Sequence, residues 1–227
     1  MTLRLVVFDV DGTLVDSQGD IVSAMAAAFA AVDRPAPDRA TVLSIVGLSL
    51  DVAMPVLAPD LPAAVHDRMV EAYKHAYMTL RATTGTEVSS PLYPGAREAL
   101  TRLQQVPDVL LGVATGKSKR GLDRLIEGHG LQGVFVTRQV ADFHPSKPHP
   151  SMLLQALAET GVSAEDAVMI GDTSYDMEMA RSAGIYGLGV SWGYHGRERL
   201  EQARAVIDDF AELGPALDAI WSVAAHE

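Results

Sequence analysis

The sequence of 227 residues contains no cysteine, few positive charges and no long uncharged hydrophobic run. Without cysteine, disulfide bonds and thiolate metal sites are excluded, which agrees with a reducing compartment. Only 18 lysines and arginines stand against 29 aspartates and glutamates. The resulting net charge of −11 disfavours a general nucleic-acid or anionic-membrane surface, because it would repel both. An anionic substrate must therefore be held by local cations.

The hydrophobic segments are too short to cross a membrane. The longest nearly uncharged one, Ile21 to Val32, is rich in alanine and is shorter than the ~20 residues that a spanning helix needs. The first apolar run is bounded by Arg4 and Asp9, which argues against a secretory signal. Hydrophobic residues make up 48% of the chain, enough for a sizeable core. We expect a globular, cytoplasmic protein.

A purely helical region follows the first predicted strand. Helical patterns separated by proline and glycine are predicted at residues 21–32, 38–46, 50–57 and 63–80. No strand-like run interrupts them. We therefore predict a small all-helical domain over residues 17–91, inserted into a larger domain that comprises residues 1–16 and 92–227.

Helices and strands alternate after this insert. Helices are predicted at residues 96–105, 118–129, 152–160, 174–183 and 215–221, and strands at 109–114, 134–136, 167–170, 187–190 and 205–207. Alternating βα units imply a parallel sheet covered by helices on both faces. The fold class predicted is α/β, with a doubly wound parallel-sheet core and a helical insert.

Two carboxylates stand directly after the first strand, in Phe8-Asp9-Val10-Asp11-Gly12-Thr13. Residues two apart on an extended segment point to the same side, so Asp9 and Asp11 address one volume beyond the strand's carboxyl end. Open α/β sheets place their ligands at this edge. An isolated motif of this kind is more often a solvated turn, so its interpretation depends on the motifs that follow.

Three later segments place polar groups at the same predicted edge. Thr115 and Gly116 end the strand at 109–114 and precede a helix, which makes a good anion cradle. Lys147 lies between Pro145 and Pro148 in an extended loop. In Gly171-Asp172-Thr173-Ser174-Tyr175-Asp176, the second aspartate also suits a capping box with Thr173, whereas Asp172 has no such structural role.

These four motifs, in this order, resemble those of the haloacid dehalogenase-like (HAD) hydrolases, and the insert resembles the helical cap of phosphoglycolate phosphatase-like members. The resemblance implies that Asp9 is the nucleophile and Asp11 the general acid and base. It implies phosphate binding by Thr115, Gly116 and Lys147. A Rossmann-like core, an aspartyl-phosphate intermediate and a small phosphomonoester substrate, with phosphoglycolate foremost, are expected.

The resemblance also implies a metal site, with Asp9, Asp11 and Asp172 as ligands and Asp176 supporting them or their waters. Carboxylates about 4 Å apart repel one another by ~4 kcal/mol per pair at an effective dielectric near 20, so such a cluster requires protonation or a cation. Oxygen-only ligands beside a phosphate suit Mg²⁺. The seven histidines show no zinc spacing.

The predicted cap has less certain contacts. In the resemblance, Gly47-Leu48-Ser49 lies where a substrate-contacting loop is found, which makes Ser49 a candidate. Arg68, Lys74 and Arg81 either contact a substrate carboxylate or belong to a solvated helix face, and the second interpretation is favoured.

Three alternatives to a phosphatase are open. A phosphosugar mutase and an inorganic pyrophosphatase share the same catalytic set, whereas Asp11 disfavours a dehalogenase. A phospho-accepting receiver domain also has an aspartate, a threonine and a lysine at strand ends, but the insert and Asp11 argue against it. The sequence indicates no oligomer and does not identify the physiological substrate.

Overall fold

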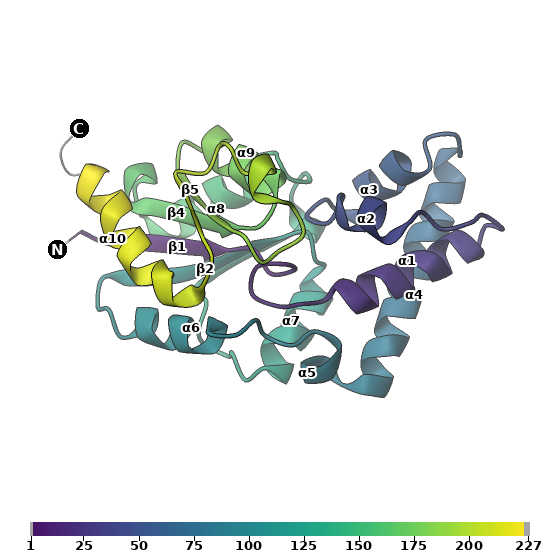
Figure 1. Ribbon diagram of the computed structural model, residues 1–227, viewed down its shortest axis with the longest axis horizontal. Helices are drawn as coiled ribbons and strands as arrows, with labels where there is room; N and C mark the ends of the chain where they lie inside the picture. Colours follow the sequence, from purple (N-terminus) through teal and green to yellow (C-terminus); the bar gives the residue numbers. More distant parts are fainter. Residues whose placement is uncertain (1, 225–227) are drawn as a thin grey trace.

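The computed structural model describes residues 2–224 and consists of a parallel sheet covered by helices, with a group of helices at one end (Figure 1). The sheet has six strands in the order β3-β2-β1-β4-β5-β6, and every neighbouring pair is parallel. The strands are β1 (Arg4–Phe8), β2 (Val109–Thr115), β3 (Thr137–Val140), β4 (Ala167–Gly171), β5 (Tyr186–Val190) and β6 (Ala205–Ile207). This confirms the predicted α/β, Rossmann-like fold.

Alternation along β1 explains why both faces of the sheet are covered. Leu5 and Val7 pack on one face with α8 (Ser151–Thr160) and α9 (Ser174–Ser182). Val6 and Phe8 pack on the other with α6 (Ala96–Gln104), α7 (Lys119–Gly128) and α10 (Leu213–Ala224). A strand buried on both faces needs a continuous apolar run, which β1 has.

The helices between β1 and β2 pack around an apolar cluster of their own. They are α1 (Gln18–Ala30), α2 (Arg39–Leu43), α3 (Leu50–Leu57), α4 (Ala63–Thr84) and α5 (Thr86–Ser89). Met25, Phe29, Met54 and Met69 belong to this cluster and are at most 4% exposed. Figure 1 shows α1–α4 beyond the carboxyl ends of the strands. We refer to α1–α5 as the cap helices.

The sequence misplaced one strand. The apolar residues 134–136 were predicted as a strand, but β3 begins at Thr137, and Val136 is 58% exposed. Thr137 and Gln139 are buried in β3 because both hydrogen-bond Glu159 Oε2, at 2.6 and 2.8 Å. A hydrophobicity pattern cannot find a strand whose buried side chains are polar and are satisfied by a distant partner.

The other differences are small. The helix expected at residues 38–46 ends at Leu43, and the short helix α5 lies where a linker was expected. None of the helices within residues 2–224 combines the length and the apolarity that a bilayer-spanning segment needs.

Candidate active site

Three neighbouring strands bring the predicted site residues together. β2 ends with Thr115, Asp9 follows β1, and Asp172 follows β4. These strands are adjacent in the sheet, and parallel strands end at the same edge, so side chains more than 150 positions apart in sequence meet there. All three residues are at most 1% exposed.

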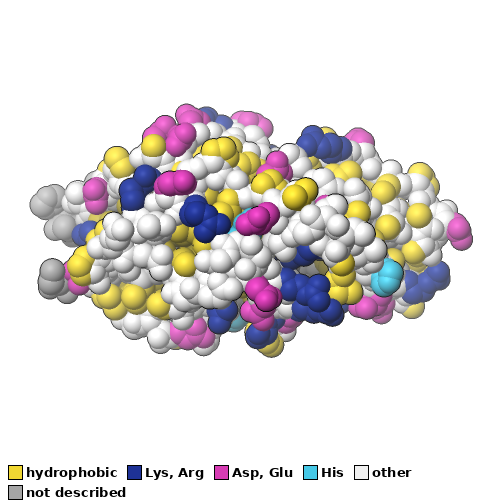
Figure 2. All heavy atoms as spheres, turned by 90° about the horizontal axis from the view of Figure 1, so that it is seen from below, with side chains coloured by type: hydrophobic (Ala, Val, Ile, Leu, Met, Phe, Trp, Pro, Cys, Tyr) yellow, Lys and Arg dark blue, Asp and Glu magenta, His cyan; other side chains and the backbone are white. Residues whose placement is uncertain are grey.

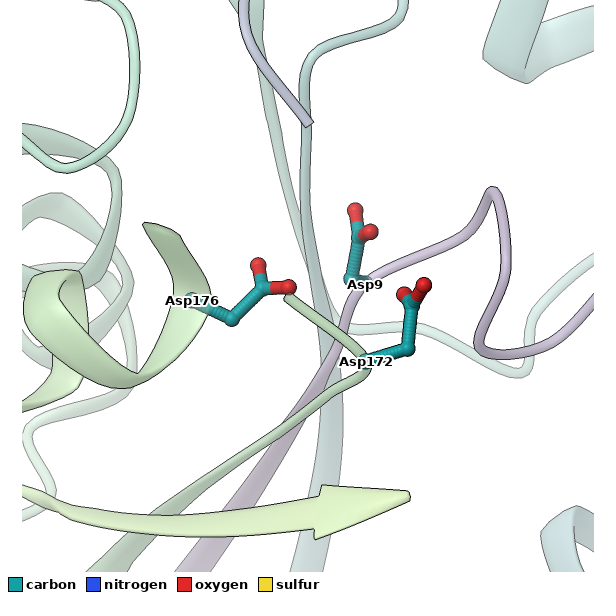
Figure 3. Close-up of side chains that lie close together, drawn as sticks. All are labelled: Asp9, Asp172 and Asp176. Carbon is teal, nitrogen blue, oxygen red and sulfur yellow. The ribbon is translucent and has the colours of Figure 1, made fainter. Parts of the chain in front are cut away.

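Asp9, Asp172 and Asp176 form what we call the carboxylate cluster. One oxygen from each lies within 4.8 Å of the other two. Figure 3 shows the Asp9 and Asp172 carboxylates side by side, with Asp176 directed towards them. Lys147 Nζ lies 2.7 Å from Asp9 Oδ1 and 2.7 Å from Asp176 Oδ1. The lysine therefore joins two of the three carboxylates.

Hydrogen bonds and close backbone contacts fix the orientation of Asp172. Its Oδ1 accepts from the Thr13 hydroxyl at 2.8 Å, and its Oδ2 accepts from the Tyr194 backbone N–H at 2.8 Å. Gly12 lies so close that a Cβ there would be 2.2 Å from Asp172 Oδ2, and its φ is +88°. Only glycine meets both conditions without strain.

Asp176 is held in the same way by the start of α9. Its Oδ2 accepts from the Thr173 backbone N–H at 3.1 Å and from the Thr173 hydroxyl at 2.6 Å. The Thr173 hydroxyl oxygen also accepts from the Asp176 backbone N–H, so the capping box expected from the sequence is present. This leaves Oδ1 of Asp176 for Lys147.

The electrostatics of the cluster are dominated by burial. Burial raises the pKa of Asp9 to about 7; Lys147 opposes this shift and Asp176 adds to it. Burial likewise raises the pKa of Asp172, and Asp176 and Asp9 raise it further. Burial alone would lower the pKa of Lys147, but the charges of Asp176 and Asp9 outweigh it and hold that pKa above its ordinary value. Three ionised carboxylates and one ammonium carry a net charge of −2.

The cluster fits a divalent metal ion. Within residues 2–224, Asp9 Oδ2 is a buried oxygen with no hydrogen-bond partner, and leaving such a group unsatisfied is costly. A divalent cation would supply the missing partner and balance the charge of −2. The Asp172 oxygens are already oriented by Thr13 and Tyr194, as is usual for metal-binding carboxylates.

Asp11 lies next to the cluster but its side chain has different partners. Both of its oxygens accept from Lys117 Nζ, at 2.6 and 2.7 Å, and the Ser17 hydroxyl also donates to it. Lys117 Nζ in turn contacts the Tyr77 hydroxyl of α4 at 3.2 Å. Asp11 is therefore connected through Lys117 to a cap helix.

A cavity of about 510 Å³ lies between the core and the cap helices. From the core, Asp9, Asp11, Thr115 and Gly116 line it, and the rest of its wall includes side chains from α1, α3 and α4. The cap is docked closely, because a Cβ on Gly116 would be 2.8 Å from the Gly47 backbone oxygen. The nucleophile candidate therefore faces a cavity that is walled by both the core and the cap helices.

Ser49 and the three basic residues of α4 take different places. The Ser49 backbone N–H donates to the Ser146 hydroxyl at 2.9 Å, which ties the cap to the Lys147 loop, and its side chain is not among those lining the cavity. Arg68 is exposed and donates to the Ala31 carbonyl. Lys74 is paired with Glu71 on the surface, whereas Arg81 is only 5% exposed and lines the cavity. Arg68 and Lys74 therefore belong to a solvated helix face, whereas Arg81 does not.

The sequence did not indicate the roles of Lys117 or of the loop after β5. That loop contributes the Tyr194 N–H to Asp172 and the Tyr194 hydroxyl, which contacts Ser17. Its Gly193 packs so tightly that a Cβ would lie 2.1 Å from Asp172 Cβ. The sequence offered one signal for this loop, because the loop follows the carboxyl end of a predicted strand, where ligands bind in open α/β sheets.

Comparison with known proteins identifies the family. The model of the "Haloacid dehalogenase-like hydrolase" family matches residues 6–190. The probable phosphatase IndB of Dickeya dadantii is 35% identical over 95% of this chain and 94% of its own. The phosphoglycolate phosphatase of Vibrio cholerae is 32% identical over 93% of this chain and 96% of its own. This chain belongs to the haloacid dehalogenase-like hydrolases.

The solved structures agree. The crystal structure of a hydrolase from Pseudomonas syringae superposes with a TM-score of 0.83 and 25% identity, and covers 97% of this chain and 99% of the other. The family predicted from the four motifs is confirmed, and so is the expected class of enzyme, a hydrolase related to phosphatases. Phosphatases of this family generally use a divalent metal, which agrees with the carboxylate cluster.

Proposed function

We propose that this protein is a Mg²⁺-dependent phosphatase that hydrolyses a small phosphomonoester through an aspartyl-phosphate on Asp9. The observation that supports this most strongly is the buried Asp9 Oδ2, which has no hydrogen-bond partner in the described part of the chain and lies beside a cavity that Thr115 and Gly116 also line. Phosphoglycolate is the leading substrate, because several full-length relatives carry that name.

In the proposed first step, an Asp9 oxygen attacks phosphorus and the bond to the leaving oxygen breaks. Asp11 donates a proton to the departing alkoxide, which leaves as the alcohol. In the second step, Asp11 takes a proton from a water whose oxygen attacks the phosphoryl group. Inorganic phosphate is released and the Asp9 carboxylate is restored. The hydrogen bonds that Asp11 accepts from Lys117 and Ser17 hold its carboxyl group in place beside Asp9.

The phosphoryl oxygens are stabilised in this proposal by Thr115, the Gly116 backbone N–H and Lys147. Lys147 already lies 2.7 Å from Asp9, so its charge is next to the group that is transferred. Asp9, the Asp11 backbone carbonyl and Asp172 would hold Mg²⁺, with Asp176 in support. The ion supplies positive charge against the developing phosphoryl charge. Residues 1–16 and 92–227 are proposed as the core domain and residues 17–91 as the cap that excludes water.

The decisive experiment is Asp9→Asn. The substitution keeps the shape but removes the nucleophile, so we expect turnover of p-nitrophenyl phosphate to fall by at least ~10⁴-fold. Mass spectrometry of acid-quenched wild type should detect one phosphoryl group on the protein, and the variant should lack it. Circular dichroism controls for folding. Turnover by the folded variant at the wild-type rate would refute the mechanism, and catalytic release of phosphate by wild type separates a phosphatase from a receiver domain.

A further inference from the structure

The side chains that line the cavity between core and cap do not share the negative net charge of the whole protein. The chain carries a net charge of −11, yet five of the residues that line the cavity are lysine or arginine and four are acidic. Figure 2 shows a group of Lys and Arg side chains beside a hollow in the face of the molecule that it draws. Such a local excess of cations favours a ligand more negative than the phosphoryl group alone.

Most of these cations already have a role or are solvated. Lys117 binds both oxygens of Asp11, and Lys74 pairs with Glu71. Arg120 and Arg124, on α7, are exposed. Their charges are therefore either neutralised by a neighbouring carboxylate or screened by water.

Arg81 differs from the other four cations that line the cavity. It stands in the last turn of α4 and is 5% exposed, and only its Nη1 has a hydrogen bond, to the Gly121 carbonyl at 3.2 Å. Its Nε and Nη2 are buried without a partner within the described chain, and it forms no ion pair there. A buried guanidinium with two unsatisfied nitrogens is costly, which indicates that a ligand completes it.

The surroundings of Arg81 locate that ligand. Its Cζ lies 5.6 Å from the centre of the Tyr77 ring, and Lys117 Nζ lies 5.1 Å from the same centre. Tyr77 thus links Arg81 to Lys117, which contacts Asp11, the proposed acid for the leaving group. Burial raises the pKa of the nearby Asp20 and the charge of Arg81 opposes this shift, but within residues 2–224 Asp20 Oδ2 also has no partner and the two residues form no ion pair. Arg81 therefore stands on the leaving-group side of the site.

We propose that Arg81 is a specificity-determining residue, and that it binds a second anionic group, a carboxylate or a phosphate, on the leaving group of the substrate. This inference rests on the proposed phosphatase function. The order Asp11, Lys117, Tyr77, Arg81 places this anion beyond the atoms next to the phosphoester. A cavity of about 510 Å³ is within the usual range for ligand pockets, about 300–1,000 Å³, and is large for a two-carbon leaving group. An ester whose second anion reaches Arg81 has a longer chain or a ring between its two anions, so this inference replaces phosphoglycolate, the leading substrate by the names of the relatives, with a longer ester of the same class.

The test compares matched substrates. Alkyl phosphates that end in a carboxylate, from phosphoglycolate to longer chains, are assayed with Mg²⁺ beside uncharged alkyl phosphates of the same length. A bisphosphate series distinguishes a phosphate from a carboxylate as the second anion. We expect wild type to favour the charged esters, with the highest kcat/KM at a chain longer than that of phosphoglycolate.

Arg81→Gln should lower kcat/KM for the favoured charged ester by at least about 30-fold, the usual result of removing one partner of a buried charge pair. The uncharged esters should change by roughly threefold or less, since they have no group for Arg81 to bind. Arg81→Lys should recover part of the preference. Arg68→Gln is the matched control, because it removes the same charge from the same helix outside the cavity.

Two results would overturn the inference while the phosphatase function stands. One is an equal loss for charged and uncharged esters in Arg81→Gln, which would make Arg81 a structural contact to Gly121. The other is a wild-type enzyme with no preference for charged esters. Absence of hydrolysis of every ester by wild type would instead refute the phosphatase function, and the inference with it.

Discussion

The two halves of the site differ in how their charges are compensated. In the carboxylate cluster, Asp9 and Asp172 follow core strands and Asp176 lies in the first turn of α9. Lys147, at 0% side-chain exposure, joins Asp9 to Asp176. On the cap side, Asp11 and Lys117 come from the core, whereas Tyr77 and Arg81 come from α4. Lys117 and Asp11 retain side-chain exposures of 9% and 13%. The first half is formed by the core alone, whereas the second combines core residues with side chains of α4.

Under the proposed function, this difference places the chemical step in the carboxylate cluster and the choice of substrate on the cap side. The carboxylate cluster is positioned by strand ends, short hydrogen bonds and glycines that leave no other space, so it does not depend on what the leaving group is. The cap side offers an arginine whose Nε and Nη2 have no partner within the described residues. It also offers an aromatic wall in which Tyr73 and Tyr77 stack at 5.9 Å. Under the proposed function, the core elements would hold the reacting groups and the cap helices would recognise the substrate.

We expect the largest difference between the two halves when the lysine of each half is replaced. Lys147→Met leaves buried carboxylates without their counter-charge, and we expect the free energy of unfolding at pH 7 to fall by about 3–5 kcal/mol. Lys117→Met should cost less, about 1–3 kcal/mol, because Asp11 keeps the Ser17 hydroxyl and contact with water. Urea denaturation in EDTA measures both. Equal losses would contradict the view that only the cluster is closed to solvent.

The cluster should also respond to pH and metal, unlike the cap side. Without metal, burial raises the pKa of Asp9 to about 7, so the folded protein keeps this proton up to about pH 7, whereas the unfolded chain loses it near the ordinary value of 3.8. The folded state then binds more protons, so stability should fall as pH rises between these values, by up to ~1.4 kcal/mol per pH unit and proton.

Saturating Mg²⁺ should remove this dependence, because the cation stabilises the ionised carboxylates. Thermal unfolding from pH 5 to pH 8, with Mg²⁺ and with EDTA, checks the prediction. The same slope in both conditions would mean that the cluster does not bind the ion.

A smaller effect is expected from a substitution that tests how the cap is docked on the core. Ser146→Ala removes the acceptor of the Ser49 N–H, which joins the cap to the Lys147 loop. The loss of one hydrogen bond, about 1 kcal/mol, should raise KM about fivefold with little change in kcat. The exposed Ser163→Ala is a suitable control. An unchanged KM would show that this bond does not hold the cap closed.

The core half of the site was predictable from the sequence because its signals are local. Asp9, Thr115 and Asp172 each follow an apolar run, and parallel strands bring their carboxyl ends to one edge. Asp176 was expected in a capping box with Thr173, and it forms one. The roles proposed for these residues remain predictions.

The cap half was not predictable, because its contacts depend on how the cap helices pack against the core. For Arg81 a solvated helix face was favoured over contact with a substrate carboxylate, and no periodicity in α4 distinguishes Arg81 from Arg68. The partnership of Lys117 with Asp11 spans 106 positions, and the Tyr194 contact with Ser17 spans 177. The strand β3 was missed for a similar reason, because Glu159 satisfies its buried polar side chains.

The sequence alone determined the parallel sheet, the helical insert and the edge at which acidic groups gather, because strand ends and hydrophobic periodicity are properties of short segments. Only the tertiary structure decided that Lys147 lies between two aspartates, that Lys117 pairs with Asp11, and that Arg81 is buried with no ion pair to any residue from 2 to 224. Pairing and burial depend on the docking of elements far apart in the chain, and no local pattern encodes the distance between them.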